Sequence, residues 1–183
     1  MSVQHFTFHK TKIDGVVVVE PQIFGDSRGY FMETYRKKVF FEGGIKANFV
    51  QDNQSKSTKN VLRGLHFQKK HPQAKLVRVL SGEVFDVCVD LRKESPTYGQ
   101  WIGETLSAEN RKQLFIPRGC AHGFLVLSDS ATFAYKCDDY YRPDDEGGIL
   151  WDDPALGIQW PLTDKPILSE KDLKWPEMDP IKI

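Results

Sequence analysis

Short segments rich in Val, Phe, Leu and Tyr recur roughly every ten residues along this chain, with turn-forming residues between them. Helical signal is sparse by comparison. Regularly spaced short strands with turn signals are typical of an all-β sandwich or barrel. We therefore predict strands at residues 15–20, 48–52, 61–68, 75–80, 83–91, 100–106, 113–116, 122–127 and 132–136.

Local signals predict the connections between these strands. The LSGE junction at residues 80–83 predicts a tight hairpin turn, whose glycine supplies a positive φ angle. Residues 36–42 precede two glycines and predict a short helix with a glycine stop. The SEKD sequence at residues 169–172 has the form of a capping box and predicts a final short helix. The Pro- and Trp-rich tail is expected to pack back on the β-core.

Length and charge limit the class of protein. A chain of 183 residues is long enough to bury one sizeable core, so we expect a single domain over residues 1–183. The 25 basic and 25 acidic side chains cancel, which argues against nucleic acid or an anionic membrane as a partner, because both attract a basic surface. The three cysteines form no C-x-x-C motif, and no apolar run is long enough for a signal peptide or a membrane span. We expect a cytoplasmic protein.

The segment VLRGLHFQ, residues 61–68, reads as a strand but carries a cation and a titratable imidazole. In a regular strand Arg63 and His66 would point to opposite faces. Gly64 lies between them, and a glycine inside a strand often marks a bulge or a close backbone approach. We predict a local irregularity at Gly64 that lets both side chains reach one cavity.

Taken one at a time, the polar residues also have ordinary structural explanations. A lone histidine in a strand is more often a satisfied core group than a catalyst. Tyr135 shares a strand face with Phe133 and Cys137, so it is expected inside, where its hydroxyl needs a partner. Asp172 suits a helix cap and Lys75 a solvated strand end. The residue pattern alone predicts only an all-β protein with unexplained inward polar side chains.

The histidines do not have the spacing of a metal site. Small barrels of the cupin type often bind a metal through an H-x-H pair, but His66 is followed by Phe-Gln. His71 lies in a polar turn and His122 is isolated in the sequence CAHGF. We therefore predict no metal site.

Seven segments, taken together and in order, resemble the dTDP-4-dehydrorhamnose 3,5-epimerase family. Any one of them would be weak support, whereas the ordered set spans almost the whole chain. Cys120 is a visible departure, because the family more often has an aromatic residue there. The segments are FGDSRGYFMETY (24–35), FVQDNQSKS (49–57), NVLRGLHFQ (60–68), GEVFDVCVDLRKESPTYGQW (82–101), LSAENRKQLFIPRGCAHGF (106–124), YKCDDYYRPDDEGGILWDDP (135–154) and LSEKD (168–172).

The resemblance implies a fold, an assembly and an activity. The expected fold is a double-stranded β-helix jelly roll of the cupin type. The expected assembly is a homodimer that exchanges an N-terminal strand, with neither a metal nor an organic cofactor. The implied reaction is epimerisation of C3 and C5 of dTDP-4-dehydro-6-deoxy-D-glucose, giving dTDP-4-dehydro-L-rhamnose for dTDP-L-rhamnose biosynthesis.

The resemblance also implies roles for four catalytic residues. The C4 ketone of the substrate acidifies the hydrogens at C3 and C5, so epimerisation requires a base, an acid on the opposite face and a donor for the enolate oxygen. His66 matches the base, since an ordinary histidine has a pKa of about 6.5. Asp172 matches the carboxylate that orients the imidazole. Tyr135 matches the acid, and Lys75 the cation that faces the C4 oxygen.

Further residues match the family's substrate-binding and supporting positions. Arg28 and Arg63 resemble ligands of the diphosphate, a role that suits forked guanidinium donors. The other implied substrate contacts are Phe31 and Glu33 (nucleotide, from across the dimer), Gln51, Asp52, Asn53 and His122 (sugar and phosphate), and Tyr141, Glu146 and Lys171 (thymine stacking and its surroundings). Asp86, inward among valines, is expected to support the site.

Three alternatives remain open on the sequence. A relative could act at one carbon only, or could be a keto-isomerase on the same class of dTDP-4-keto-sugar. A metal-dependent cupin enzyme would need ligands that the histidine spacing does not supply. A non-catalytic nucleotide-sugar-binding module would need no His–Asp–Tyr–Lys set.

Overall fold

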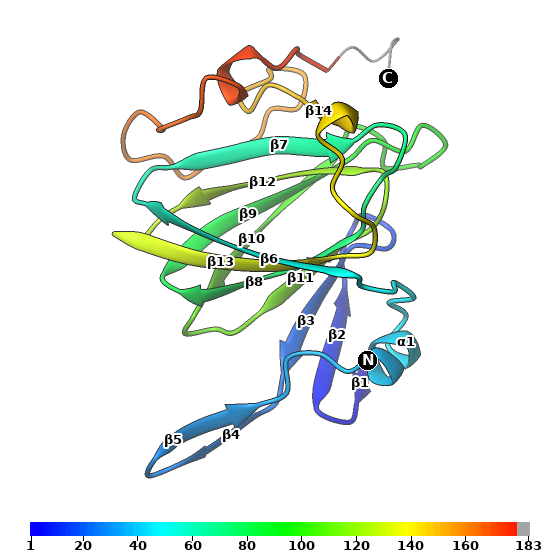
Figure 1. The fold of residues 1–183 in the computed structure, drawn as a ribbon, viewed down its shortest axis with the longest axis vertical. Helices are drawn as coiled ribbons and strands as arrows, with labels where there is room; N and C mark the ends of the chain where they lie inside the picture. Colours follow the sequence, from blue (N-terminus) through cyan, green and yellow to red (C-terminus); the bar gives the residue numbers. More distant parts are fainter. Residues whose placement is uncertain (179–183) are drawn as a thin grey trace.

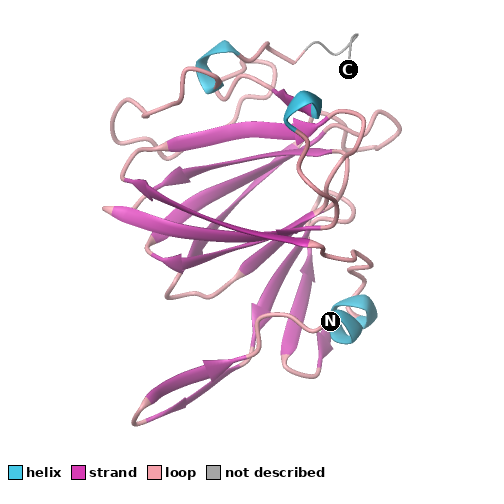
Figure 2. Ribbon diagram, in the orientation of Figure 1, coloured by secondary structure: helices cyan, strands magenta, loops and turns pink. Residues whose placement is uncertain are grey.

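The computed structural model describes residues 1–178, whose regular elements are almost all antiparallel β-strands (Figures 1 and 2). The all-β prediction is confirmed. The larger sheet has the order β1 (Ser2–Val3), β2 (Phe6–Lys10), β3 (Val17–Pro21), β11 (Gln113–Ile116), β8 (Lys75–Ser81), β13 (Ser130–Cys137) and β6 (Gln51–Thr58). The smaller sheet has the order β10 (Trp101–Ser107), β9 (Glu83–Asp90), β12 (Cys120–Val126), β7 (Leu62–Gln68) and β14 (Glu146–Gly148).

The remaining elements lie outside these two sheets. Strands β4 (Ile23–Asp26) and β5 (Gly29–Met32) form a separate two-stranded ribbon, which projects away from the sheets in Figure 1. The helix α1 (Lys37–Glu42) confirms the helix predicted at residues 36–42, and it ends before Gly43 as expected. Two 3₁₀ turns complete the set, η1 (Pro143–Asp145) and η2 (Asp172–Lys174).

Side-chain alternation along the strands places the main core between the two large sheets. In β9, Val84 and Cys88 point into the cluster between the sheets, and Val87 and Val89 point the other way. The inward position between Val84 and Cys88 belongs to Asp86, which is fully buried. Period-2 alternation therefore delivers a carboxylate to the interior of an otherwise apolar layer.

Each sheet is also covered on its outer face. On the seven-stranded sheet, Val39 and Phe40 of α1 pack against Phe6, Phe8 and Leu76. On the five-stranded sheet, the C-terminal segment covers the strands, with Leu156, Trp160 and Met178 in the third apolar cluster. The expectation that the aromatic tail packs on the β-core is confirmed. This tail also carries η2 to the end of the molecule where β7 and β14 lie (Figure 1).

Two details of the strand prediction are wrong. The turn at residues 80–83 exists, with Gly82 at φ +80°, but it joins β8 of one sheet to β9 of the other, so it is not a hairpin. The strand predicted at residues 48–52 begins only at Gln51. Strands β1, β2, β4, β5 and β14 were not predicted. Strands β1 and β14 are very short, and β4 and β5 lack a buried face.

No helix within residues 1–178 is both long and apolar enough to cross a membrane. The single domain predicted over residues 1–183 stays a prediction, and its last residues, 179–183, lie outside the described part of the chain.

Candidate active site

Strand β7 carries a bulge at Gly64, as the sequence predicts. His66 pairs with His122 of β12 and Arg63 pairs with Phe124, so three steps along β7 match two steps along β12. Paired residues in a sheet point to the same face, and His122 and Phe124 are two residues apart. The extra residue in β7 therefore turns Arg63 and His66 to one face of the sheet. His66 lines the cavity on that face, whereas Arg63 is exposed and does not line it, so the prediction that both side chains reach one cavity holds for His66 alone.

Only glycine fits at this bulge. Gly64 has φ +128°, and a Cβ atom there would lie 2.5 Å from Cα of Gly123 and 2.8 Å from the carbonyl oxygen of His122. Both obstacles are backbone atoms of the neighbouring strand, which cannot rotate away. The bulge that orients His66 thus depends on close contact between the backbones of β7 and β12.

We expect Gly64→Ala to lower the free energy of unfolding by about 3 kcal/mol, the sum of a positive-φ penalty and overpacking. Urea denaturation would measure the change. Gly44→Ala is the matched control, because Gly44 has φ +96° and a methyl group added there would meet nothing within 4 Å. Equal losses in the two variants would show that the β7–β12 contact contributes nothing.

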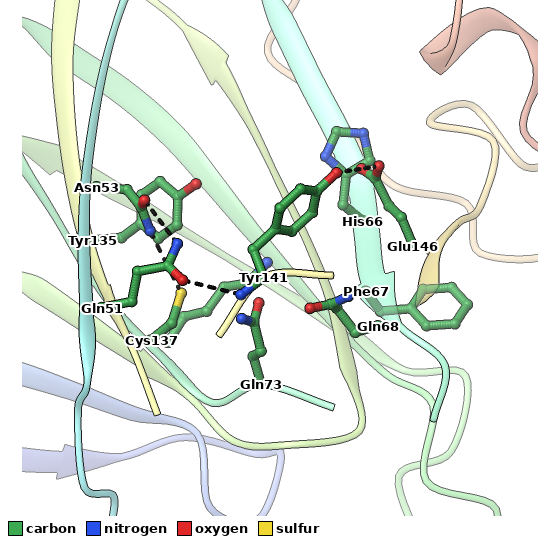
Figure 3. A pocket seen from close by; sticks show the side chains of 11 residues that line it. Gln51, Asn53, His66, Phe67, Gln68, Gln73, Tyr135, Cys137, Tyr141 and Glu146 are labelled. Carbon is green, nitrogen blue, oxygen red and sulfur yellow. Dashed lines mark hydrogen bonds between the residues drawn. The ribbon is translucent and has the colours of Figure 1, made fainter. Parts of the chain in front are cut away.

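A cavity of about 280 Å³ opens between the two sheets next to this bulge. Figure 3 shows His66 and Glu146 on one side of it and Asn53, Tyr135 and Cys137 on the other. The seven-stranded sheet contributes Gln51, Asn53, Lys75, Tyr135 and Cys137, the five-stranded sheet contributes His66, Phe67, Gln68 and Glu146, and loops contribute Gln73 and Tyr141. Side chains from both sheets therefore face one another across the cavity.

The imidazole of His66 is held by Asp172. Its Nε2 lies 2.5 Å from Oδ1 of Asp172, a residue 106 positions away that is 3% exposed. Burial acts to raise the pKa of Asp172, but hydrogen bonds with His66, Ser169 and Trp175 and the charge of His66 hold it below its ordinary value. An ionised carboxylate can only accept, so Nε2 carries the proton. Nδ1 is then the ring nitrogen left to accept a proton in the cavity.

The capping box predicted at residues 169–172 is formed only in part. The backbone N–H of Asp172 donates to Oγ of Ser169 at 3.1 Å, at the start of η2. The carboxylate does not return to the Ser169 backbone, as a full capping box would require. It bonds to His66 instead, so the local turn orients the aspartate toward the cavity.

Lys75 lies at the first position of β8, with its side chain in the cavity. Burial lowers the pKa of Lys75, an effect that the negative charge of Asp86 partly offsets. Within residues 1–178 no carboxylate lies within ion-pair distance of its ammonium group. The ammonium group is therefore available to an oxygen of a bound molecule.

Tyr135 enters the cavity from β13, on the sheet opposite His66. It packs beside Phe133 with ring centroids 6.2 Å apart, and it shares the inward face with Cys137 as predicted. Burial raises the pKa of Tyr135, while the nearby charge of Arg63 acts to lower it. The phenol is therefore kept protonated and can act as a proton donor.

Comparison with known proteins identifies the family. The family model described as dTDP-4-dehydrorhamnose 3,5-epimerase matches residues 10–179. The chain belongs to the dTDP-4-dehydrorhamnose 3,5-epimerase family. Proteins with that name from Salmonella typhimurium and Methanothermobacter thermautotrophicus are 58% and 56% identical to it, over 93% of this chain and 94% and 93% of theirs.

A solved structure supports the fold in the same way. The dTDP-6-deoxy-D-glucose-3,5-epimerase of Legionella pneumophila, crystallised with dTDP-4-keto-L-rhamnose, superposes with a TM-score of 0.92 at 53% identity, covering 94% of this chain and 93% of that one. The predicted cupin-like jelly roll and the predicted enzyme class, an epimerase, are confirmed by these matches.

Behind the cavity of this epimerase lies a second histidine–aspartate pair. Nε2 of His122 lies 2.9 Å from Oδ2 of Asp86, and the imidazole stacks on Phe133 with centroids 5.9 Å apart. Burial raises the pKa of Asp86, an effect that His122 opposes, and burial lowers the pKa of His122. Asp86 therefore lies where a supporting residue was expected, whereas His122 is interior and does not line the cavity.

Three of the predicted nucleotide-binding residues meet at the mouth of the epimerase cavity. The carboxylate of Glu146 accepts hydrogen bonds from Lys171 at 2.7 Å and from the Tyr141 hydroxyl at 2.8 Å. Burial acts to raise the pKa of Glu146, but these two donors hold it below its ordinary value. The exposed Tyr141 ring is thereby fixed at the opening.

Other predicted binding residues lie elsewhere in this chain. Arg28 and Phe31 lie on the projecting ribbon, where Arg28 pairs with Asp26 at 2.6 Å. Further predicted contacts have protein partners: Glu33 pairs with Arg36, Asp52 points outward and pairs with Lys136, and Arg63 donates to Ser57 at 3.0 Å. Gln51 and Asn53 line the cavity, since they alternate with Asp52 along β6.

Sequence reasoning missed several residues of the site. Gln68 lines the cavity two residues beyond His66, so extending the alternation would have found it. Cys137 was predicted to face inward beside Tyr135 but was not named as a residue of the site. Gln73, in the loop before β8, carried no such signal. No group of three or more His, Cys, Asp or Glu side chains that could hold a metal ion occurs in the described part of the chain.

Proposed function

We propose that this epimerase inverts C3 and C5 of dTDP-4-dehydro-6-deoxy-D-glucose to give dTDP-4-dehydro-L-rhamnose, a step of dTDP-L-rhamnose biosynthesis. The observation that carries the proposal is the pair His66–Asp172 facing Tyr135 across one cavity, with the two groups on opposite sheets. The ligand named for the Legionella structure, dTDP-4-keto-L-rhamnose, supports the substrate class.

Proton removal is assigned to His66. With Nε2 donating to Asp172, Nδ1 takes the proton from C3 or C5, and the C–H electron pair moves into an enolate with the C4 oxygen. The charge that develops on the imidazole is stabilised by the ionised carboxylate of Asp172, as in other histidine–aspartate dyads. Burial of this carboxylate strengthens the interaction, because little water screens it.

Stabilisation of the negative charge on the enolate oxygen is assigned to Lys75. Its ammonium group has no competing carboxylate within residues 1–178, and it lies on the same cavity wall as Tyr135. A preorganised cation at a developing oxyanion stabilises the transition state more than the neutral ketone. The negative charge of Asp86 partly compensates for the burial of this cation without neutralising it.

Reprotonation is assigned to Tyr135. A sugar ring lying between the sheets has His66 on one face and Tyr135 on the other, so removal and return of a proton occur on opposite faces. That arrangement inverts the carbon, whereas a single acid–base residue would return the proton to the face it came from. The raised pKa of Tyr135 keeps its hydroxyl protonated until the enolate forms.

Nucleotide binding is assigned to the mouth and to a second subunit. The cavity of about 280 Å³ is near the lower limit of ligand pockets, which span about 300–1,000 Å³. The cavity is therefore large enough for the sugar of the substrate alone. Arg63 then binds the diphosphate, and the ring of Tyr141 stacks on the thymine. Arg28 and Phe31 then act from the partner's ribbon, and Glu33 acts from the residue that follows it.

The ribbon supports a homodimer in which β4 and β5 are exchanged. Phe24, Tyr30 and Phe31 are 41%, 55% and 67% exposed on a segment that projects from the sheets (Figure 1). Aromatic side chains clustered on a two-stranded ribbon are rarely left in water, and such patches mark interfaces.

We expect sedimentation velocity to show a dimer that the double change Phe24→Ser and Phe31→Ser weakens at least about tenfold, because buried aromatic anchors dominate interfaces. Phe41→Ser is the matched control, since Phe41 is also 55% exposed but lies on α1. A monomeric wild type, or a dimer that tolerates the ribbon changes, would contradict strand exchange.

The proposed function is tested by incubation with dTDP-4-keto-6-deoxyglucose in deuterium oxide, with label positions read by NMR. Deuterium at both C3 and C5 together with inversion at both is the expected result. Label and inversion at one carbon would assign a single-carbon epimerase instead, and a shift of the carbonyl group a keto-isomerase. No exchange at all would leave a binding module.

We expect Tyr135→Phe to separate exchange from inversion. His66 remains able to remove and return a proton on its own face, so deuterium wash-in should persist within about tenfold of wild type. Net inversion should fall about 10²-fold, the usual contribution of a general acid. Tyr35→Phe, outside the cavity, is the control and should change neither rate. Loss of exchange together with inversion would show that Tyr135 is not simply the acid.

A further inference from the structure

Trp175 contacts both members of the proposed catalytic pair. Its indole Nε1 donates to Oδ1 of Asp172 at 3.3 Å, the same oxygen that bonds to His66. Its ring also meets the imidazole of His66 edge to face, with centroids 6.2 Å apart and planes at 70°. Trp175 does not line the cavity, so these contacts are made from behind the pair.

The fold makes room for this ring at a specific place. A Cβ atom on Gly148, which pairs with His66 in the sheet, would overlap the Trp175 ring system. The glycine therefore lets the indole lie directly on β14, beside β7. The ring centroid is also 5.9 Å from Nζ of Lys171, which is close enough for a cation–π contact.

The chain on both sides of Trp175 is fixed to the β-core. The N–H of Leu150 donates to the carbonyl oxygen of Pro176 at 2.8 Å, and the N–H of Met178 donates to the buried carboxylate of Asp153. Upstream, Ser169 accepts the N–H of Asp172. The segment that carries Asp172 is thus held at several points, and it brings Trp175 as well as Asp172 into contact with His66.

We propose that Trp175 is a positioning residue for the catalytic pair: its indole N–H fixes the Asp172 carboxylate, and its ring excludes water from the rear of the His66 imidazole. This inference rests on the proposed function of the pair. A carboxylate with two donors on one oxygen has a defined rotation, and the geometry of a proton-transfer group decides its rate.

The test compares two tryptophans of the same C-terminal segment. Trp175→Phe keeps an aromatic ring and removes the N–H, and its kcat is expected to fall about tenfold with KM unchanged, as for loss of one hydrogen bond to a charged group. Trp160→Phe is the matched control, because Trp160 also donates its N–H, to the carbonyl oxygen of Trp151 at 2.8 Å. Its kcat should stay at the wild-type value even if its melting temperature falls equally.

A spectroscopic measurement separates positioning from general stability. The proton shared by His66 and Asp172 should give a downfield ¹H resonance that moves in Trp175→Phe and stays in Trp160→Phe. If Trp175→Phe does not fold, the indole ¹H–¹⁵N resonances of wild type and Asp172→Asn answer the same question. The Trp175 signal should then move more than those of the other three tryptophans.

Several outcomes would overturn the proposal. An unchanged kcat in Trp175→Phe would do so. A raised KM at constant kcat would do so too, because it would assign Trp175 a role at the nucleotide-binding mouth through Lys171. Equal shifts of all four indole resonances in Asp172→Asn would also contradict it. Failure of the proposed function is distinguishable, because the wild type would then exchange no deuterium into dTDP-4-keto-6-deoxyglucose. The resonance measurements do not depend on that substrate.

Discussion

Replacing His66 with glutamine is expected to lower kcat by about 10⁴-fold, at the upper end of what general base catalysis contributes. Glutamine is similar in length and can still donate an N–H to Asp172, so the 2.5 Å contact has a replacement. It offers no group that accepts a proton near neutral pH. The chemical step should therefore fail while the fold and the cavity remain.

The measurement is the rate of deuterium wash-in at C3 and C5 alongside turnover, both of which should fall together. His71→Gln provides the control, since His71 also pairs with an aspartate, Asp145, at 3.2 Å but outside the cavity. That variant should keep its wild-type rates. If His66→Gln retained more than about a tenth of wild-type exchange, another base would have to be sought.

The sequence predicts the fold well where at least one face of a strand is buried. Residues 113–116 match β11 fully, and the inward setting of Tyr135 follows from its alternation with Phe133 and Cys137. The bulge at Gly64 is also readable, because a cation, a glycine and an imidazole in one apolar strand conflict with a regular pleat. In each case the information lies within a few neighbouring residues.

Longer-range features escape such reasoning. Nothing local links Asp172 to His66 across 106 residues, and only the resemblance to the family suggested the pair. The ribbon β4–β5 was missed because neither of its strands has a buried face in the same chain. Gly82 has the positive φ of a hairpin glycine, yet β8 and β9 belong to different sheets. The residues of a turn determine the local direction of the chain, whereas packing of the core determines which strands pair.

Changing Asp172 to asparagine is expected to lower kcat about 10³-fold, comparable to the loss of about 10⁴ when the triad aspartate of a serine protease is changed in the same way. The asparagine amide can donate to Nε2 of His66, which favours the tautomer with its proton on Nδ1. The nitrogen that faces the substrate would then lack a free electron pair. A neutral amide also cannot stabilise the charged imidazole.

The double variant with His66→Gln sharpens this prediction. If Asp172 acts only through His66, then His66→Gln/Asp172→Asn should be no slower than His66→Gln alone, because residues that act as a unit are non-additive. Asp145→Asn removes the carboxylate of the other, remote pair and should leave kcat unchanged. Additive losses in the double variant would assign Asp172 a separate contact with the substrate.

The free energy of unfolding should depend on pH through the carboxylate of Asp172. Because the pKa of Asp172 is lowered in the folded enzyme, its ionised form stabilises the fold fully above the unfolded aspartate value of about 3.9. That contribution disappears as the pH falls through the lower, folded value. Asp172→Asn should therefore be less stable than wild type by urea denaturation at pH 7, and the difference should shrink in acid. A constant difference from pH 7 to pH 3 would mean that packing around η2, and not the charge on Asp172, carries the effect.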